Sequence, residues 1–186
     1  MGVIQGVTEF LPVSSSGHLV IAQYLLGINS PGNTLEILFH FGTLLSVIFV
    51  FFNEIKLILI SLHERNTQIL IVYLIIATIP AVFVGIGLKD CLLGIFDNVK
   101  YVGLALLFTG SILILSSKFK HSQKKHSFFS SLAIGLAQAL AIIPGVSRSG
   151  VTISMSIYLG IAPKEAAKFS FLLSIPIISV SYTHLR

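Results

Sequence analysis

Long runs of apolar residues dominate the chain, and several approach the length of a membrane-crossing helix. A helix needs about 20 apolar residues to cross the hydrocarbon core of a bilayer. Residues 37–52, 69–88 and 101–115 approach or reach this length, and a shorter run covers 169–180. The pattern predicts ordinary membrane spans at these positions.

Two further apolar stretches are interrupted near their middles. The first covers residues 2–27 and is broken at 12–18, and the second covers 128–159 and is broken at 144–150. The breaks hold proline, which removes a backbone donor, glycine, which loosens the chain, and serine, which competes for backbone hydrogen bonds. Each stretch is predicted to form two half-helices joined by a polar turn, a re-entrant hairpin. A long kinked span is the alternative.

The two interrupted stretches also resemble each other in sequence. A shift of 133 positions aligns identical residues at Gly2–Gly135, Gln5–Gln138, Val13–Val146, Ser14–Ser147, Ser16–Ser149 and Gly17–Gly150. Because three predicted spans separate the hairpins, the second hairpin should enter from the opposite face, and the two turns should meet inside the membrane. The expected fold is an all-α polytopic membrane bundle with an inverted repeat and two re-entrant helical hairpins. It forms one domain over 1–186, with repeats over about 2–52 and 128–180.

The charged residues fit this topology. The loops that would share one face, 53–68, 118–127 and 160–168, hold eight Lys and Arg residues, whereas the opposite loops hold only Lys89 and Lys100. Cytoplasmic loops collect Lys and Arg, so the first set is predicted to be cytoplasmic. The basic cluster at 118–126 is interpreted as an anchor near anionic lipid.

Composition excludes several classes of protein. Of the 186 residues, 54% are hydrophobic and 10% charged, with a mean hydropathy of +0.94 and a net charge of +5. A soluble domain carries about 25% charged residues. A soluble enzyme, a disordered protein and a nucleic-acid-binding domain are therefore not expected. Cys91 is the single cysteine, and the histidines lack zinc-ligand spacing.

Ionisable residues inside apolar segments mark the candidate site, because each costs about 3 kcal/mol to insert. They are Glu9, His18, Glu36, His40 and Arg148. Arg148 offers a planar fork of donors suited to phosphate, and the hydroxyls of Ser147, Ser149 and Thr152 surround it in sequence. The alternative is an internal Arg148–Glu9 salt bridge without a substrate. Glu36 and His40 share a helical face, and either a functional or a structural role fits them.

The first turn supplies a candidate nucleophile. Ser14, Ser15 and Ser16 are followed by His18, and a serine needs an adjacent base such as histidine to attack. Gln5 and Glu9 lie four residues apart on one helical face, where they would hold a divalent cation or orient His18. Together these residues predict an anion pocket at membrane depth, for which a phosphate attached to a lipid is the natural ligand.

Three motifs carry a resemblance to a known family. Residues 5–18 read Gln-Gly-Val-Thr-Glu-Phe-Leu-Pro-Val-Ser-Ser-Ser-Gly-His, residues 144–152 read Pro-Gly-Val-Ser-Arg-Ser-Gly-Val-Thr, and a third stretch covers 40–44. The chain resembles the undecaprenyl-diphosphate phosphatases, the bacitracin-resistance membrane phosphatases of bacteria, from Gly2 to about Val180.

The resemblance implies a hydrolase that removes the terminal phosphate of undecaprenyl diphosphate and recycles the carrier lipid for cell-wall synthesis. It implies a multi-pass protein of the bacterial inner membrane, supported by Mg²⁺ or Ca²⁺ at Glu9 and Gln5. The expected catalytic residues are Ser15 as nucleophile, His18 as general acid/base, Glu9 and Arg148. The motif alone leaves open whether serine or histidine attacks. The expected substrate contacts are Ser14, Ser16, His40, Gly145, Ser147, Ser149 and Thr152. The expected partners are a polyprenyl diphosphate lipid, the membrane and a second copy in a homodimer.

Other expectations concern the chain ends and a competing function. Family members continue beyond Val180, so the sequence is interpreted as a fragment whose residues 181–186 form a non-native tail. A lipid transporter, or flippase, is the alternative function, because broken helices in an inverted repeat are common in transporters. A transporter does not need a hydroxyl–imidazole pair beside an arginine. The acid-phosphatase-like lipid phosphatases need a downstream aspartate, and none follows Arg148.

Overall fold

The fold is helical throughout the part of the chain that the structure describes, residues 1–28, 34–87, 99–119 and 123–184 of a computed structural model. The helices are α1 (Gly2–Phe10), α2 (Ser15–Leu26), α3 (Thr34–Val50), α4 (Phe52–Ile60), α5 (Arg65–Gly87), α7 (Val99–Ser116), α8 (Phe128–Leu140), α9 (Arg148–Tyr158) and α10 (Pro163–His184). No strand occurs in these ranges. The predicted all-α class is confirmed.

The helix pairs α1–α2 and α8–α9 are both interrupted where the sequence predicted a break. Ser14 precedes α2 and accepts a hydrogen bond from the Gly17 N–H, and Ser147 precedes α9 and accepts one from the Gly150 N–H. Such capping satisfies a backbone donor that the first helical turn leaves unpaired. One detail of the prediction is wrong: residues 15–18 and 148–150 belong to the following helices, because these caps let the helices start inside the polar motifs.

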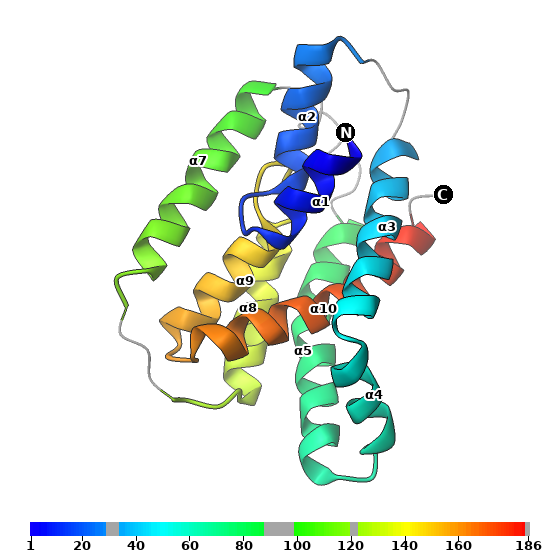
Figure 1. The fold of residues 1–186 in the computed structure, drawn as a ribbon. Coiled ribbons are helices and arrows are strands. Elements are labelled where there is room, and N and C mark those ends of the chain that lie inside the picture. The colour runs from blue at the N-terminus through cyan, green and yellow to red at the C-terminus, as the bar shows by residue number, and fades with distance from the viewer. Residues whose placement is uncertain (29–33, 88–98, 120–122, 185–186) are drawn as a thin grey trace.

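Each pair folds back on itself, and the two pairs approach from opposite ends of the molecule (Figure 1). Their turns are in contact. A Cβ atom added to Gly17 would lie 3.0 Å from the Gly145 Cα, and one added to Gly150 would lie 3.0 Å from the Pro12 carbonyl oxygen. Folding back is the arrangement predicted for hairpins and differs from two long kinked spans. The inverted repeat and the depth of the hairpins in a bilayer stay predictions.

Two helices in the described ranges, α5 and α7, are long and apolar enough to cross a membrane by themselves. A third span is possible by length if α3 and α4 count as one, although the chain bends by 67° between Leu38–Val50 and Phe52–Ile60. The run at 169–180 lies within the longer α10, whose first turns carry Lys164, Glu165 and Lys168. Its role as a span stays a prediction.

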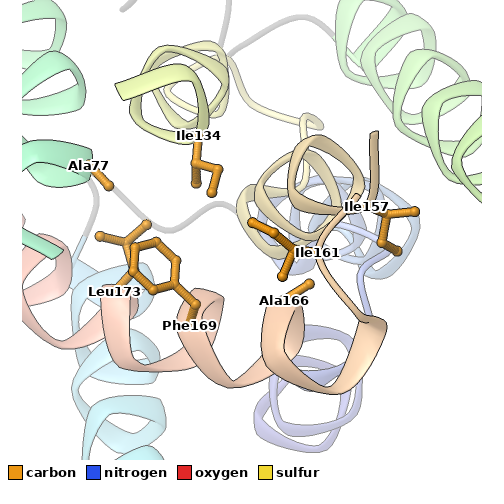
Figure 2. Packing of buried hydrophobic residues seen from close by; sticks show 7 residues of the cluster. All are labelled: Ala77, Ile134, Ile157, Ile161, Ala166, Phe169 and Leu173. Atoms are coloured by element: carbon orange, nitrogen blue, oxygen red, sulfur yellow. The ribbon is translucent and has the colours of Figure 1, made fainter. Parts of the chain in front are cut away.

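The packed core lies where α5, α8, α9 and α10 meet. Helix α8 approaches α5 so closely that a Cβ atom on Gly135 would lie 2.7 Å from the Ala77 carbonyl oxygen, and Gln138 donates from Nε2 to that oxygen at 3.1 Å. A buried apolar cluster fills the space around this contact (Figure 2), with Ala77, Ile134, Ile157, Ile161, Ala166, Phe169 and Leu173 as members.

Large apolar side chains also cover much of the outer surface. Phe49 is 84% exposed, Phe83 75% and Leu107 70%. Exposed apolar surface on this scale is costly in water and matches a lipid environment. The long apolar helices and this surface together indicate a protein that crosses the membrane more than once.

Candidate active site

The carboxylate of Glu9 is the centre of the candidate site. Arg148 donates from Nη2 to Glu9 Oε1 at 2.7 Å, Ser15 donates from Oγ to Oε2, and Gln5 donates from Nε2 to Oε2 at 3.1 Å. The Glu9 side chain is only 10% exposed and that of Arg148 22%. A carboxylate with so little exposure to water needs hydrogen-bonding or charged partners. The three partners of Glu9 come from α1, α2 and α9.

The amide of Gln5 ties this centre to α3. Gln5 is 2% exposed, and its Nε2 donates both to Glu9 and to Thr43 Oγ1, the latter at 3.1 Å. Thr43 in turn donates to the Phe39 carbonyl at 3.0 Å. The ring of His40 lies close enough to interact electrostatically with the Glu9 carboxylate. The third motif therefore contributes to the same site as the first.

The first turn holds its backbone in an unusual conformation. Ser14 has φ +68°, in the left-handed region that non-glycine residues rarely occupy, at a cost of about 1–3 kcal/mol. Its hydroxyl caps α2 and lies 3.3 Å from Ser16 Oγ. Its carbonyl oxygen lies 2.7 Å from Nδ1 of His18. Because a carbonyl oxygen only accepts, Nδ1 carries the hydrogen, and Nε2 is the acceptor nitrogen of the neutral ring.

The second turn is built in a similar way around Ser147. The Ser147 hydroxyl accepts from the Gly150 N–H at 3.1 Å and lies 3.4 Å from Ser149 Oγ. Gly145 adopts φ +93°, which a glycine permits. Arg148 is the first residue of α9, so this turn sets where its side chain leaves the backbone.

Thr152 is placed differently from the expectation. Its hydroxyl lies 2.6 Å from Ser170 Oγ and donates to the Arg148 carbonyl at 2.9 Å, and the residue is 1% exposed. These contacts join α9 to α10. A direct substrate contact by Thr152 stays a prediction that this geometry does not favour.

The structure brings the two motifs together at Glu9, Ser15 and Arg148, and the Arg148–Glu9 salt bridge, which the sequence offered as the alternative to phosphate binding, is present. The hydroxyl of Ser15, however, is bonded to Glu9, whereas His18 is bonded to the backbone of its own turn. The roles of both residues stay predictions. The side chain of Glu36 lies outside the described residues.

Sequence reasoning missed two threonines that hold this site. Thr43 belongs to the third motif, but no role was assigned to it, and Thr109 on α7 accepts the Ser147 N–H at 3.1 Å. The only available signal was a hydroxyl in the middle of an apolar helix, which is also typical of a threonine that bonds its own helix.

The oxygen atoms of Gln5 and Glu9 could supply some of the ligands that a hard divalent cation needs. The Oε1 atom of Gln5 is buried without a hydrogen-bond partner among the described residues, and the Nε2 atom of the same amide donates to the Glu9 carboxylate. Mg²⁺ and Ca²⁺ prefer oxygen ligands of this kind. Since no group of three His, Cys, Asp or Glu residues gathers in the described ranges, further ligands would have to come from water and substrate.

The chain was then compared with known proteins. Its residues 1–185 match the family described as Bacitracin resistance protein BacA. An Undecaprenyl-diphosphatase of Halothermothrix orenii is 43% identical over 181 residues, which cover 96% of this chain and 69% of the relative. The same name belongs to relatives in Protochlamydia amoebophila, 45% identical over 181 residues with coverage of 96% and 68%, and Syntrophotalea carbinolica, 41% identical over 187 residues with coverage of 96% and 71%.

The family match extends over all the elements described above, including both interrupted helix pairs and the α3 segment that holds Thr43. It includes every residue that contacts Glu9. The chain therefore belongs to the BacA family of bacitracin-resistance proteins.

Proposed function

We propose that this chain hydrolyses undecaprenyl diphosphate to undecaprenyl phosphate and inorganic phosphate. The observation that carries the proposal is the cluster in which Glu9 accepts from Ser15 and Arg148, residues of two motifs that are far apart in sequence. The shared name of the relatives supports a phosphatase over the transporter alternative.

Arg148 is proposed to bind the terminal phosphate. Glu9 uses one N–H of the guanidinium through Nη2, and a guanidinium has five N–H donors in all. The remaining donors suit phosphate oxygens and would stabilise the charge on the transferring group. Glu9 meanwhile keeps the arginine oriented when no substrate is bound. The hydroxyls of Ser14, Ser16 and Ser149 are proposed to add neutral donors.

Ser15 is proposed to attack the terminal phosphorus. A bond forms between Ser15 Oγ and phosphorus, while the bond from phosphorus to the bridging oxygen breaks and undecaprenyl phosphate leaves. The hydroxyl proton passes to Glu9, to which Ser15 already donates. The leaving oxygen belongs to a phosphate and departs as an anion.

His18 is proposed to act in the second step. Water attacks the phosphoserine, the Ser15–phosphorus bond breaks, and inorganic phosphate leaves. The ring of His18 has Nδ1 held by the Ser14 carbonyl, so Nε2 is available to accept the proton of the attacking water. Glu9 returns the proton that it took in the first step to the Ser15 oxygen as the Ser15–phosphorus bond breaks, and His18 releases the water-derived proton to the departing phosphate or to water.

A divalent cation, Mg²⁺ or Ca²⁺, is proposed to be held by Gln5 Oε1 and Glu9. When bound, it would supply positive charge that screens the phosphates from the carboxylate. The enzyme is further proposed to reside in the bacterial inner membrane, with the polyprenyl chain of the substrate in the bilayer, and to form a homodimer.

The test is phosphate release from a polyprenyl diphosphate in detergent, with Mg²⁺ or Ca²⁺ and after chelation. Ser15→Ala is expected to lower release at least about a hundredfold, because it removes the nucleophile. Ser111→Ala is the matched control: Ser111 is exposed on α7, and within the described ranges its hydroxyl donates only to the Leu107 carbonyl of its own helix. Absence of release by the unmodified chain with both metals would refute the proposal, and unchanged release by Ser15→Ala would refute the role of the serine.

A further inference from the structure

One side chain of α7 holds the turn that precedes Arg148. The hydroxyl of Thr109 accepts the Ser147 N–H at 3.1 Å and lies 3.1 Å from the Gly145 carbonyl oxygen and 3.0 Å from that of Ala105. A hydroxyl has a single proton, so it donates to one of these carbonyls at a time. Thr109 is 2% exposed, which keeps water from replacing these bonds.

The turn itself is pressed against α7. Gly145 has φ +93°, and a Cβ atom there would lie 2.6 Å from the Val102 carbonyl oxygen and 2.8 Å from the Ala105 Cβ. Packing this close sets the distance between turn and helix but does not set the direction of the Ser147 N–H. A hydrogen bond has a preferred angle as well as a length, so Thr109 supplies the directional restraint.

Arg148 follows Ser147 directly, and its guanidinium reaches Glu9 at 2.7 Å. We propose that Thr109 is a positioning residue of the phosphatase site: its hydroxyl fixes the 145–147 turn and thereby the direction of Arg148, without touching the substrate. This inference rests on the proposed function.

The first test is Thr109→Val, which keeps the branched shape of the side chain and removes the hydroxyl. It leaves the buried Ser147 N–H unpaired, a loss expected to lower kcat about tenfold. KM is expected to change less than about threefold, because a misdirected arginine matters most for the charge that develops in the transition state. Thr109→Ser keeps the hydroxyl and is expected to restore kcat to within about twofold of the unmodified chain.

The matched control for removing a buried threonine hydroxyl is Thr78→Val. Thr78 is a buried threonine of the apolar helix α5, and in the part of the chain that the structure describes its hydroxyl donates only to the Leu74 carbonyl of its own helix. If Thr109 is merely part of the packing, Thr109→Val lowers the yield or the melting temperature while kcat per folded molecule stays within about twofold. That result would overturn the proposal.

A second pair of variants tests the proposal in case Thr109→Val folds poorly. Thr109→Ser and Thr109→Ala are close in size and differ by the hydroxyl. The serine variant is expected to be about tenfold faster than the alanine variant per folded molecule, and equal rates would overturn the proposal. Phosphate release by the unmodified chain separates the two claims: its absence refutes the proposed function, whereas its presence with an equally active Thr109→Val refutes only the role of Thr109.

Discussion

Glu9 shows how single residues define this site. One carboxylate accepts from the side chains of Gln5, Ser15 and Arg148, so neither charge of the Glu9–Arg148 pair is left without a partner in a poorly hydrated place. Glu9 and Arg148 were predicted to belong to one site because a charge inside an apolar segment is costly and is typical of a functional site. Ser15 was predicted to belong to it because a serine close to a histidine is a candidate nucleophile. The sequence did not predict that Ser15 donates to Glu9, because the direction of a hydroxyl depends on how two hairpins pack.

A second titratable residue lies at the opposite end of α8. His126 precedes α8, and its ring stacks on Phe169 with centroids 4.1 Å apart. Burial lowers the pKa of His126 below its ordinary value of 6.5, an effect that the Glu165 carboxylate partly offsets. The unfolded chain therefore binds this proton more tightly than the folded chain, so stability is full above pH 6.5 and falls as the pH drops below it.

We accordingly expect the melting temperature in detergent to fall between about pH 7.5 and pH 5.5, and the fall to be smaller in His126→Gln. His63→Gln is the control, because His63 is exposed in the turn between α4 and α5. Equal pH dependence of the melting temperature in the unmodified chain and in His126→Gln would contradict this role of His126.

At the scale of elements, the two breaks were predictable and the bend at Phe51 was not. The breaks at 11–14 and 141–147 coincide with Pro and Ser residues that disfavour a continuous helix, and Ser14 and Ser147 cap the helices that follow. The 67° bend between α3 and α4 falls at the end of the predicted span 37–52, just before the polar residues Asn53 and Glu54, so hydropathy predicts the end of a span there but not a helix that continues at an angle.

The close approach of α8 to α5 leads to a prediction about Gly135. A methyl group there would lie 2.7 Å from the carbonyl oxygen and 2.9 Å from the Cα of Ala77, and backbone atoms cannot move aside cheaply. Gly135→Ala is therefore expected to lower the free energy of unfolding by about 1–3 kcal/mol, measured as a lower melting temperature.

Gly103→Ala on α7 is the matched control, because no atom of the described residues outside its own helix and neighbours lies within 4 Å of a Cβ atom at Gly103. Alanine favours a helix over glycine by about 1 kcal/mol, so this variant should be at least as stable as the unmodified chain. If Gly135→Ala melts at the temperature of Gly103→Ala, α8 does not pack on α5 as described.

At the scale of the whole molecule, the positions of the loops agree with the charge pattern. The α4–α5 turn, the end of α7, the start of α8 and the α9–α10 turn lie in the lower half of Figure 1, whereas the end of α2 and the start of α7 lie in the upper half. The order of the helices followed from the sequence except for α4 (Phe52–Ile60), which lies where a loop was predicted over 53–68. The sequence also predicted that the two turns meet, but not the particular contact between Gly17 and Gly145, since that depends on how four helices pack.

Sidedness can be measured with single cysteines in a Cys91→Ser background. An impermeant maleimide applied to right-side-out spheroplasts is expected to label Ile28→Cys, at the end of α2. It should label His63→Cys, between α4 and α5, only after lysis. The reverse pattern would invert the topology, and labelling of both sites in intact spheroplasts would contradict the predicted placement in the membrane.

The separation of Glu9 from its arginine has a consequence for biosynthesis. The two residues are 139 positions apart. At about 5–20 residues per second, a ribosome needs roughly 7–28 seconds to add that length of chain. A nascent chain thus contains the first hairpin long before the guanidinium exists, when only the neutral donors of Gln5 and Ser15 are present, and a buried carboxylate without a cation is costly in lipid. We therefore expect the first hairpin to stay near water, or to carry a protonated Glu9, until Arg148 has been made.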